Sequence, residues 1–157
     1  MDHSSHQASR QTGAYWSLAL QTVVSGIIMY LVMFVMIDGL ASFYNNLNML
    51  YMTLMMVAPM VVLMILAMRH MFPSKAANIA LITASLVAFF GSFVLIRTQT
   101  TIGDTAFLRS MIPHHSGAIL MCREAQLSDP EVIQLCDSIK RSQRQEIDEM
   151  KAILARR

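Results

Sequence analysis

The chain has 157 residues, of which 55% are hydrophobic and only 14% are charged. A soluble domain carries about a quarter charged residues, so the composition argues against a wholly soluble protein. The net charge of +2, without a run of Lys or Arg, gives no reason to expect nucleic acid as a partner. Residues 97–157 hold nine of the twelve basic and eight of the ten acidic groups. This asymmetry predicts a lipid-soluble part followed by a water-exposed part.

Three apolar stretches are long enough to cross a bilayer, which takes about 20 helical residues. They cover residues 16–37, 47–68 and 76–96, and none contains an ionised side chain. We therefore predict an all-α membrane protein with a transmembrane region over residues 16–97, preceded by a flexible tail over residues 1–15.

The connections between these stretches differ in charge. Residues 38–46 contain no Lys or Arg, whereas residues 69–75 contain Arg69 and Lys75. The positive-inside rule places the second connection and the N-terminus in the cytoplasm. Three crossings then place residues 97–157 outside, so the expected location is a bacterial inner (cell) membrane with a periplasmic C-terminal part.

The water-exposed part, residues 98–157, shows the pattern of two helices joined by a short turn. Apolar residues at three- and four-residue spacing predict a helix over residues 104–127, with Asp104 as its N-cap. Asp129 precedes a proline and is expected to cap a second helix over residues 130–154.

A short turn makes two successive helices antiparallel, so positions equidistant from Asp129 should face each other. A hairpin of about 50 residues buries little surface, so we expect it to dimerise into a four-helix bundle or to pack on another protein. The predicted facing pairs are Cys122 with Cys136, His115 with Gln143, and Met111 with Ile147.

The motif Met111-Ile112-Pro113-His114-His115, followed by Met121 and Cys122, carries the strongest chemical signal. At helical spacing these thioethers, imidazoles and the thiol share one face, and such donors suit copper and other transition metals. Pro113 is expected to kink or restart the helix. The alternative is a helical core that uses Met as a filler.

This segment resembles the domain of unknown function 305 family. The resemblance covers about residues 104–154 and rests on Asp104, Phe107-Leu108, the motif from Met111 to His115, Ala118-Ile119, Met121, Ile139, Ser142-Gln143, Glu146-Ile147, Met150 and Leu154. It implies a ferritin-like helical bundle in the periplasm or at the cell surface, and copper binding in members linked to copper tolerance. The ligands it implies here are Met111, His114, His115, Met121 and Met150. Two features depart from the family: Cys122 replaces the usual Ala, and many members are soluble exported proteins.

Cys122 and Cys136 admit three interpretations. They form a disulfide in an oxidising compartment, they add thiolates to a copper site, or they are small buried residues.

Methionine is enriched, with 15 in the chain. In the second apolar stretch Met56, Met60 and Met64 continue a four-residue repeat that forms a stripe along a helix. The stripe is consistent with simple packing or with a pathway for Cu(I), which makes these three residues secondary metal candidates.

The N-terminal Met1-Asp2-His3 is a further secondary candidate. A free amine with His at position three can chelate Cu(II) or Ni(II) in a plane.

The sequence thus predicts a membrane-anchored copper-binding protein that sequesters or delivers copper on the periplasmic side and serves copper homeostasis. The expected partners are membrane lipid, a second copy of the chain, and a copper donor or acceptor protein. No nucleophile–base pair or phosphate loop is present, so we do not expect an enzyme. The alternatives are a copper transporter that uses the Met stripe, and a metal-free accessory or structural membrane subunit.

Overall fold

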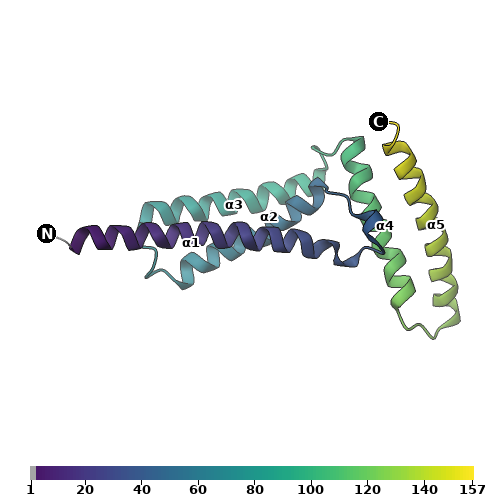
Figure 1. Cartoon of the computed structure of the whole chain (residues 1–157), viewed down its shortest axis with the longest axis horizontal. Helices are drawn as coiled ribbons and strands as arrows, with labels where there is room; N and C mark the ends of the chain where they lie inside the picture. The colour runs from purple at the N-terminus through teal and green to yellow at the C-terminus, as the bar shows by residue number, and fades with distance from the viewer. Residues whose placement is uncertain (1–2) are drawn as a thin grey trace. The chain divides into compact units, whose positions relative to one another are not determined.

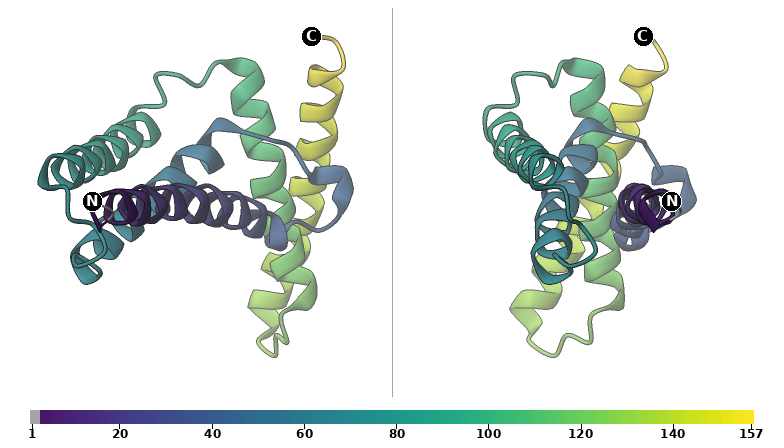
Figure 2. Two further views of the ribbon diagram at one scale, coloured as in Figure 1. Left: turned by 60° about the vertical axis from the view of Figure 1, so that its left-hand side comes forward. Right: turned by 90° about the vertical axis from the view of Figure 1, so that its left-hand side faces the viewer.

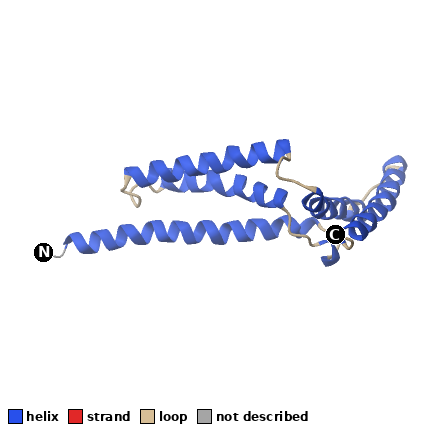
Figure 3. Cartoon of the chain, turned by 90° about the horizontal axis from the view of Figure 1, so that it is seen from above, coloured by secondary structure: helices blue, strands red, loops and turns tan. Residues whose placement is uncertain are grey.

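The computed structural model describes residues 3–157, with side chains from residue 13 onward. All regular structure in this range is helical, and no strand occurs in it (Figures 1 and 3). The elements are α1 (His3–Val32), η1 (Met33–Met36), η2 (Leu40–Ser42), α2 (Leu47–Ala67), α3 (Lys75–Thr98), α4 (Asp104–Glu124) and α5 (Pro130–Leu154), where η marks a 3-10 helix. They form two compact units: Met1–Tyr30 with Leu50–Gln99, and Leu31–Met49 with Thr100–Arg157.

Three helices are long and apolar enough to cross a membrane. They cover Gly13–Met36, Leu47–Ala67 and Lys75–Thr98, with mean hydropathies of 2.2, 2.3 and 2.5. These bounds lie within three residues of those predicted from the sequence. Helix α1 already begins at His3, so the backbone of residues 3–15 continues the helix where the sequence predicted a tail. Extending an existing helix is far less costly than nucleating one, and no proline interrupts this segment.

The first unit is built around a small apolar core. Its buried residues are Leu18, Val57, Val61, Ile65 and Phe72. Three of them recur every four residues on α2, because that spacing keeps side chains on one helix face. Gly26 of α1 lies opposite Val57, where an added Cβ would be 3.6 Å from a valine methyl.

Tyr15 joins α1 to the connection between α2 and α3. Its hydroxyl donates to Asn78 Oδ1 at 2.9 Å and accepts from the Ser74 N–H at 3.2 Å. Asn78 in turn donates to the Phe72 carbonyl at 2.7 Å, and the Phe72 ring lies 5.2 Å from that of Tyr15. These bonds satisfy polar groups next to apolar segments, where unpaired groups are costly.

The second unit contains the helical hairpin, with α4 and α5 side by side in both views of Figure 2. Asp129 caps α5 as predicted, accepting from the N–H groups of Glu131 and Val132. The prediction for α4 is wrong by one residue, since Gly103 is the N-cap and Asp104 lies in the first turn. There its carboxylate pairs with Arg157 at 2.7 Å.

Helix α4 runs without interruption from Asp104 to Glu124, so Pro113 does not restart it. Pro113 is buried and lacks only the N–H that would bond to the carbonyl of Arg109. The motif on either side of Pro113 therefore keeps one helical register.

The connection between α1 and α2 packs against α4, a contact that the sequence did not predict. The backbone N–H of Asp38 donates to Ser116 Oγ at 2.7 Å, and the Asp38 carboxylate pairs with Arg123. A Cβ built on Gly117 would lie 3.4 Å from the Met36 carbonyl oxygen. Ser116 is fully buried beneath this contact. Two small residues on α4 thus let the connection approach the helix closely.

Substitutions at Gly117 should separate helix propensity from this close approach. Gly117→Ala should be tolerated or raise the free energy of unfolding by up to about 1 kcal/mol, because its Cβ meets only an ordinary contact and Ala favours a helix. Gly117→Leu should lower stability, because its longer side chain cannot fit beneath Met36. Thermal unfolding of both variants in detergent measures the difference, and equal melting temperatures would contradict the predicted contact.

Candidate metal site on the helical hairpin

The five ligand candidates on the hairpin fall into an inner and an outer group. His115 of α4 and Met150 of α5 are only 7% and 8% exposed, and Met111 is half-buried against the hairpin core to which Met150 belongs. His114 is exposed, and Met121 is 54% exposed. The helical register of α4 produces this division, because His115 turns toward α5 whereas His114 and Met121 turn away from it.

Both ring nitrogens of His115 have hydrogen-bond partners. Nδ1 lies 2.9 Å from the Met111 carbonyl oxygen, and Nε2 lies 2.6 Å from Glu146 Oε2. A carbonyl only accepts, so Nδ1 carries a proton and donates it. Nε2 faces Glu146, so the ring is held by α4 through one nitrogen and by α5 through the other. Nε2 becomes available to a metal only when Glu146 moves, and this side chain is 47% exposed.

Glu146, not Gln143, is the partner of His115. The sequence placed Gln143 opposite because it counted residues from Asp129. Side chains on a helix lean toward its N-terminus, so on antiparallel helices His115 and Glu146 lean toward each other's level. The three-residue offset follows from this lean. Met111 and Ile147, which the sequence also paired, both belong to the hairpin core.

The thioethers of Met111 and Met150 contribute to the apolar core of the hairpin. The buried members of this core are Leu108, Ile112, Ile119, Ile147 and Met150, with Met111 packed against them. Met111 lies one helical turn before His114 and His115, so its sulfur can approach either imidazole. Within the described residues no three His, Cys, Asp or Glu side chains are grouped to hold a metal.

Met121 is separated from the other candidates along α4. It lies seven residues after His114, about 10 Å along the axis at 1.5 Å per residue. Both side chains lean the same way along the helix, so they do not converge on one ion. The rings of His114 and His115 are much closer, with centroids 5.9 Å apart.

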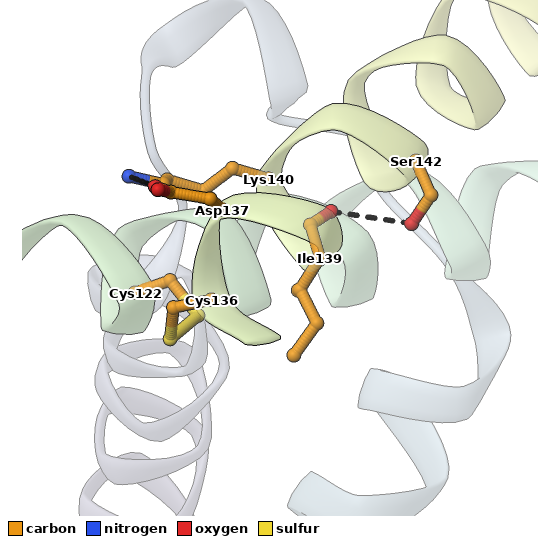
Figure 4. Close-up of a disulfide and its surroundings, with 6 residues drawn as sticks. All are labelled: Cys122, Cys136, Asp137, Ile139, Lys140 and Ser142. Carbon is orange, nitrogen blue, oxygen red and sulfur yellow. Dashed lines mark hydrogen bonds and ion pairs between the residues drawn. A yellow bond between two sulfur atoms is a disulfide. The ribbon is translucent and has the colours of Figure 1, made fainter. Parts of the chain in front are cut away.

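Cys122 and Cys136 form a disulfide across the hairpin (Figure 4). Their Cα atoms are 5.3 Å apart, within the usual range for a disulfide. Of the three interpretations of these cysteines, the structure contains the disulfide, so neither sulfur is a thiolate ligand. Beside it, Lys140 pairs with Asp137 at 2.9 Å and lowers the pKa of that carboxyl group.

The secondary candidates do not form one enclosed surface. Met56 is exposed on α2, whereas Met60 and Met64 pack against the core of the first unit. A repeat of four residues drifts around a helix of 3.6 residues per turn, which explains the division. The N-terminal candidate rests on Met1, Asp2 and the side chain of His3, which lie outside the described residues.

Comparison with known proteins supports the resemblance of the hairpin to the domain of unknown function 305 family. A family model described as a domain of unknown function, DUF305, matches residues 94–154. An uncharacterised protein of Acanthamoeba polyphaga mimivirus is 40% identical over 115 residues, which cover 71% of this chain and 73% of the relative. No solved structure matches the chain. The 115-residue match is longer than the hairpin, so it also includes part of the membrane region.

Removing the disulfide should destabilise the hairpin. The two cysteines are 14 residues apart, and closing a loop of this size contributes about 3 kcal/mol in the chain-entropy model. A Cys122→Ser/Cys136→Ser variant should therefore unfold at a lower temperature than the oxidised protein. A thiol titration of the denatured, unreduced wild type is the control, and two reactive thiols would contradict the disulfide itself.

Replacing Glu146 should remove a hydrogen bond from His115 and lower the stability of the hairpin. Glu146→Ala leaves a buried ring nitrogen without a partner, at a cost of about 1–3 kcal/mol, whereas Glu146→Gln retains an acceptor and should cost less. Glu149→Ala, at another exposed acid of α5, is the matched control. Chemical denaturation measures all three, and a Glu146→Ala loss no larger than that of the control would contradict the bond to His115.

Proposed function

The chain belongs to the DUF305 family, and from this premise we propose that it is a membrane-anchored copper-binding protein that sequesters copper or passes it to another protein. Its three apolar helices provide the anchor, and the α4–α5 hairpin provides the ligands.

The observation that carries the proposal is the placement of Met111 one helical turn before His114 and His115 on α4. The Pro113 position leaves the helix intact, so the thioether and both imidazoles stay within one turn of each other. Met150 of α5 contributes a second thioether to the hairpin core against which Met111 packs. Thioethers select soft ions such as Cu(I), and imidazole binds copper in either oxidation state. Imidazole also binds zinc, so the thioethers are the ligands that favour copper in this set.

His114 and His115 would have different roles in binding. His114 is exposed and can meet an incoming ion directly. His115 would join only after Glu146 has released its Nε2. Capture would thus begin at the surface of α4 and proceed toward the hairpin core.

The disulfide supports placing the hairpin on the outer side of the cell membrane. Disulfides persist in oxidising compartments such as the bacterial periplasm and are rare in the cytosol. The charge difference between the two connections favours the same orientation, with the N-terminus in the cytoplasm. Under this proposal the protein binds copper outside the cytoplasm of a bacterial cell, where it would protect the cell from copper or supply copper to a partner protein.

Copper loading of the full-length protein in mild detergent tests this function. Wild type should retain stoichiometric Cu(I) or the surrogate ion Ag(I) after desalting, and His114→Ala/His115→Ala should lose most of it. Ag(I) needs no reductant and so leaves the disulfide intact.

His70→Ala removes an exposed imidazole from the α2–α3 connection and is the matched control, expected to bind as wild type. Equal metal in wild type and the double variant would move the site to the Met stripe or the N-terminal residues. A wild type that retains no metal would overturn the function.

A further inference from the structure

The connection between α1 and α2 carries an exposed apolar side chain just beyond the first membrane-spanning segment. That segment ends at Met36, and Leu40, four residues later, is 89% exposed. Residues 39–46 contain no charged side chain, and the carboxylate of Asp38 is paired with Arg123. An uncharged loop with an exposed leucine, placed directly at the end of a span, suits the interface between lipid and water.

Leu40 lies on the side of the connection that adjoins the end of this span. It begins the 3-10 helix η2, where three residues complete a turn, so Leu40 and Phe43 share one face. The ring centroid of Phe43 lies 4.2 Å from that of Phe34, which belongs to the last part of the span. Ser42 lies on another face of η2 and is buried. The shared face of Leu40 and Phe43 is therefore next to the membrane boundary.

The same connection is packed along α4 within the second unit. After the first span, the Asp38 N–H donates to Ser116 Oγ at 2.7 Å. The Met36 carbonyl oxygen lies 3.4 Å from the position of a Cβ on Gly117. Before the second span, Tyr44 packs against the hairpin core, three residues ahead of the start of α2. Contacts near the ends of two membrane spans thus hold α4 against the connection.

We propose that the α1–α2 connection lies in the headgroup layer of the bilayer, with Leu40 inserted at the boundary with the acyl chains. Lipid is the partner that fits this surface, because both ends of the connection continue into segments that can cross the bilayer core. The headgroup layer is about 5–8 Å thick on each side of the core, which is enough to cover a short 3-10 helix.

This position of the connection also fixes where α4 lies. Because α4 packs directly on the connection, the hairpin is held at the membrane surface and does not extend away from it on a free linker. His114 is about 5 Å along α4 from Gly117. Under the proposed function, copper would therefore be taken up close to the lipid headgroups. The lipid contact itself does not depend on copper binding.

Depth-dependent fluorescence quenching tests the position of Leu40 in the full-length protein, reconstituted in phosphatidylcholine vesicles. The native cysteines are bonded to each other, so Leu40→Cys supplies the reactive thiol for a nitrobenzoxadiazole label. Leu40 is exposed, so this substitution removes little packing within the protein. A nitroxide at acyl carbon 5 of the lipid should quench the label at least twofold more than a nitroxide at carbon 12. Iodide on both sides of the bilayer should quench it little.

Gln145→Cys with the same label is the matched control. Gln145 is exposed and lies two residues before the buried Ile147, so it is on the side of α5 that is turned away from α4. Its label should be quenched by iodide and by neither nitroxide lipid.

Three results for the label at residue 40 would overturn the proposal. Strong quenching by iodide, with none by the nitroxide lipids, would place Leu40 in water. Protection from iodide and from both lipids would show that protein covers it, either another part of the chain or a second copy. Stronger quenching from carbon 12 than from carbon 5 would place Leu40 in the bilayer core and not at its boundary.

Discussion

The structure of the second unit depends on the packing of α4 between α5 and the connection that leaves α1. A hairpin of two helices has little buried surface, because each helix can cover only one face of the other. Here α4 gains a second covered face through Ser116 and Gly117, and the disulfide closes the opposite contact with α5. These constraints fix the rotation of α4 about its axis. That rotation decides that His115 points inward and His114 outward.

The ion pair between Arg123 and Asp38 also restrains the rotation of α4. Arg123 also pairs with Glu124 at 2.6 Å, and hydrogen bonding to that carboxylate, together with the charge of Asp38, raises the pKa of the guanidinium. Arg123 is partly exposed, so its contribution to stability is small compared with the buried contact at Ser116. The main effect of this ion pair is to position the α1–α2 connection, because it holds the Asp38 carboxylate at the end of α4 that carries the disulfide.

Local signals in the sequence were sufficient for the helices and for much of the hairpin. Long apolar stretches, the Asp129-Pro130 cap and equal spacing from the turn predicted the three apolar helices, α5 and the facing cysteines, because each of these depends on neighbouring residues. The contact of Met36 and Asp38 with α4 joins residues about 80 positions apart and left no periodic signal. Counting residues from Asp129 also failed to predict the pairing of His115 with Glu146, because residue spacing does not include the direction in which side chains lean. Asp104 was assigned as a cap because Asp favours that position, yet Gly103 takes it and Asp104 meets Arg157 instead.

Methionine serves two purposes in this chain, and burial distinguishes them. Met60 and Met64 pack against the core of the first unit, where the flexible thioether fills space well. Met111 lies at the edge of the hairpin core, within one turn of two histidines, and Met121 lies outside it. A buried thioether that binds a metal has to give up packing contacts, whereas an exposed one gives up only water. Under the proposed function, exposed side chains such as His114 would therefore take up copper at a lower cost in stability than the buried His115 and Met150.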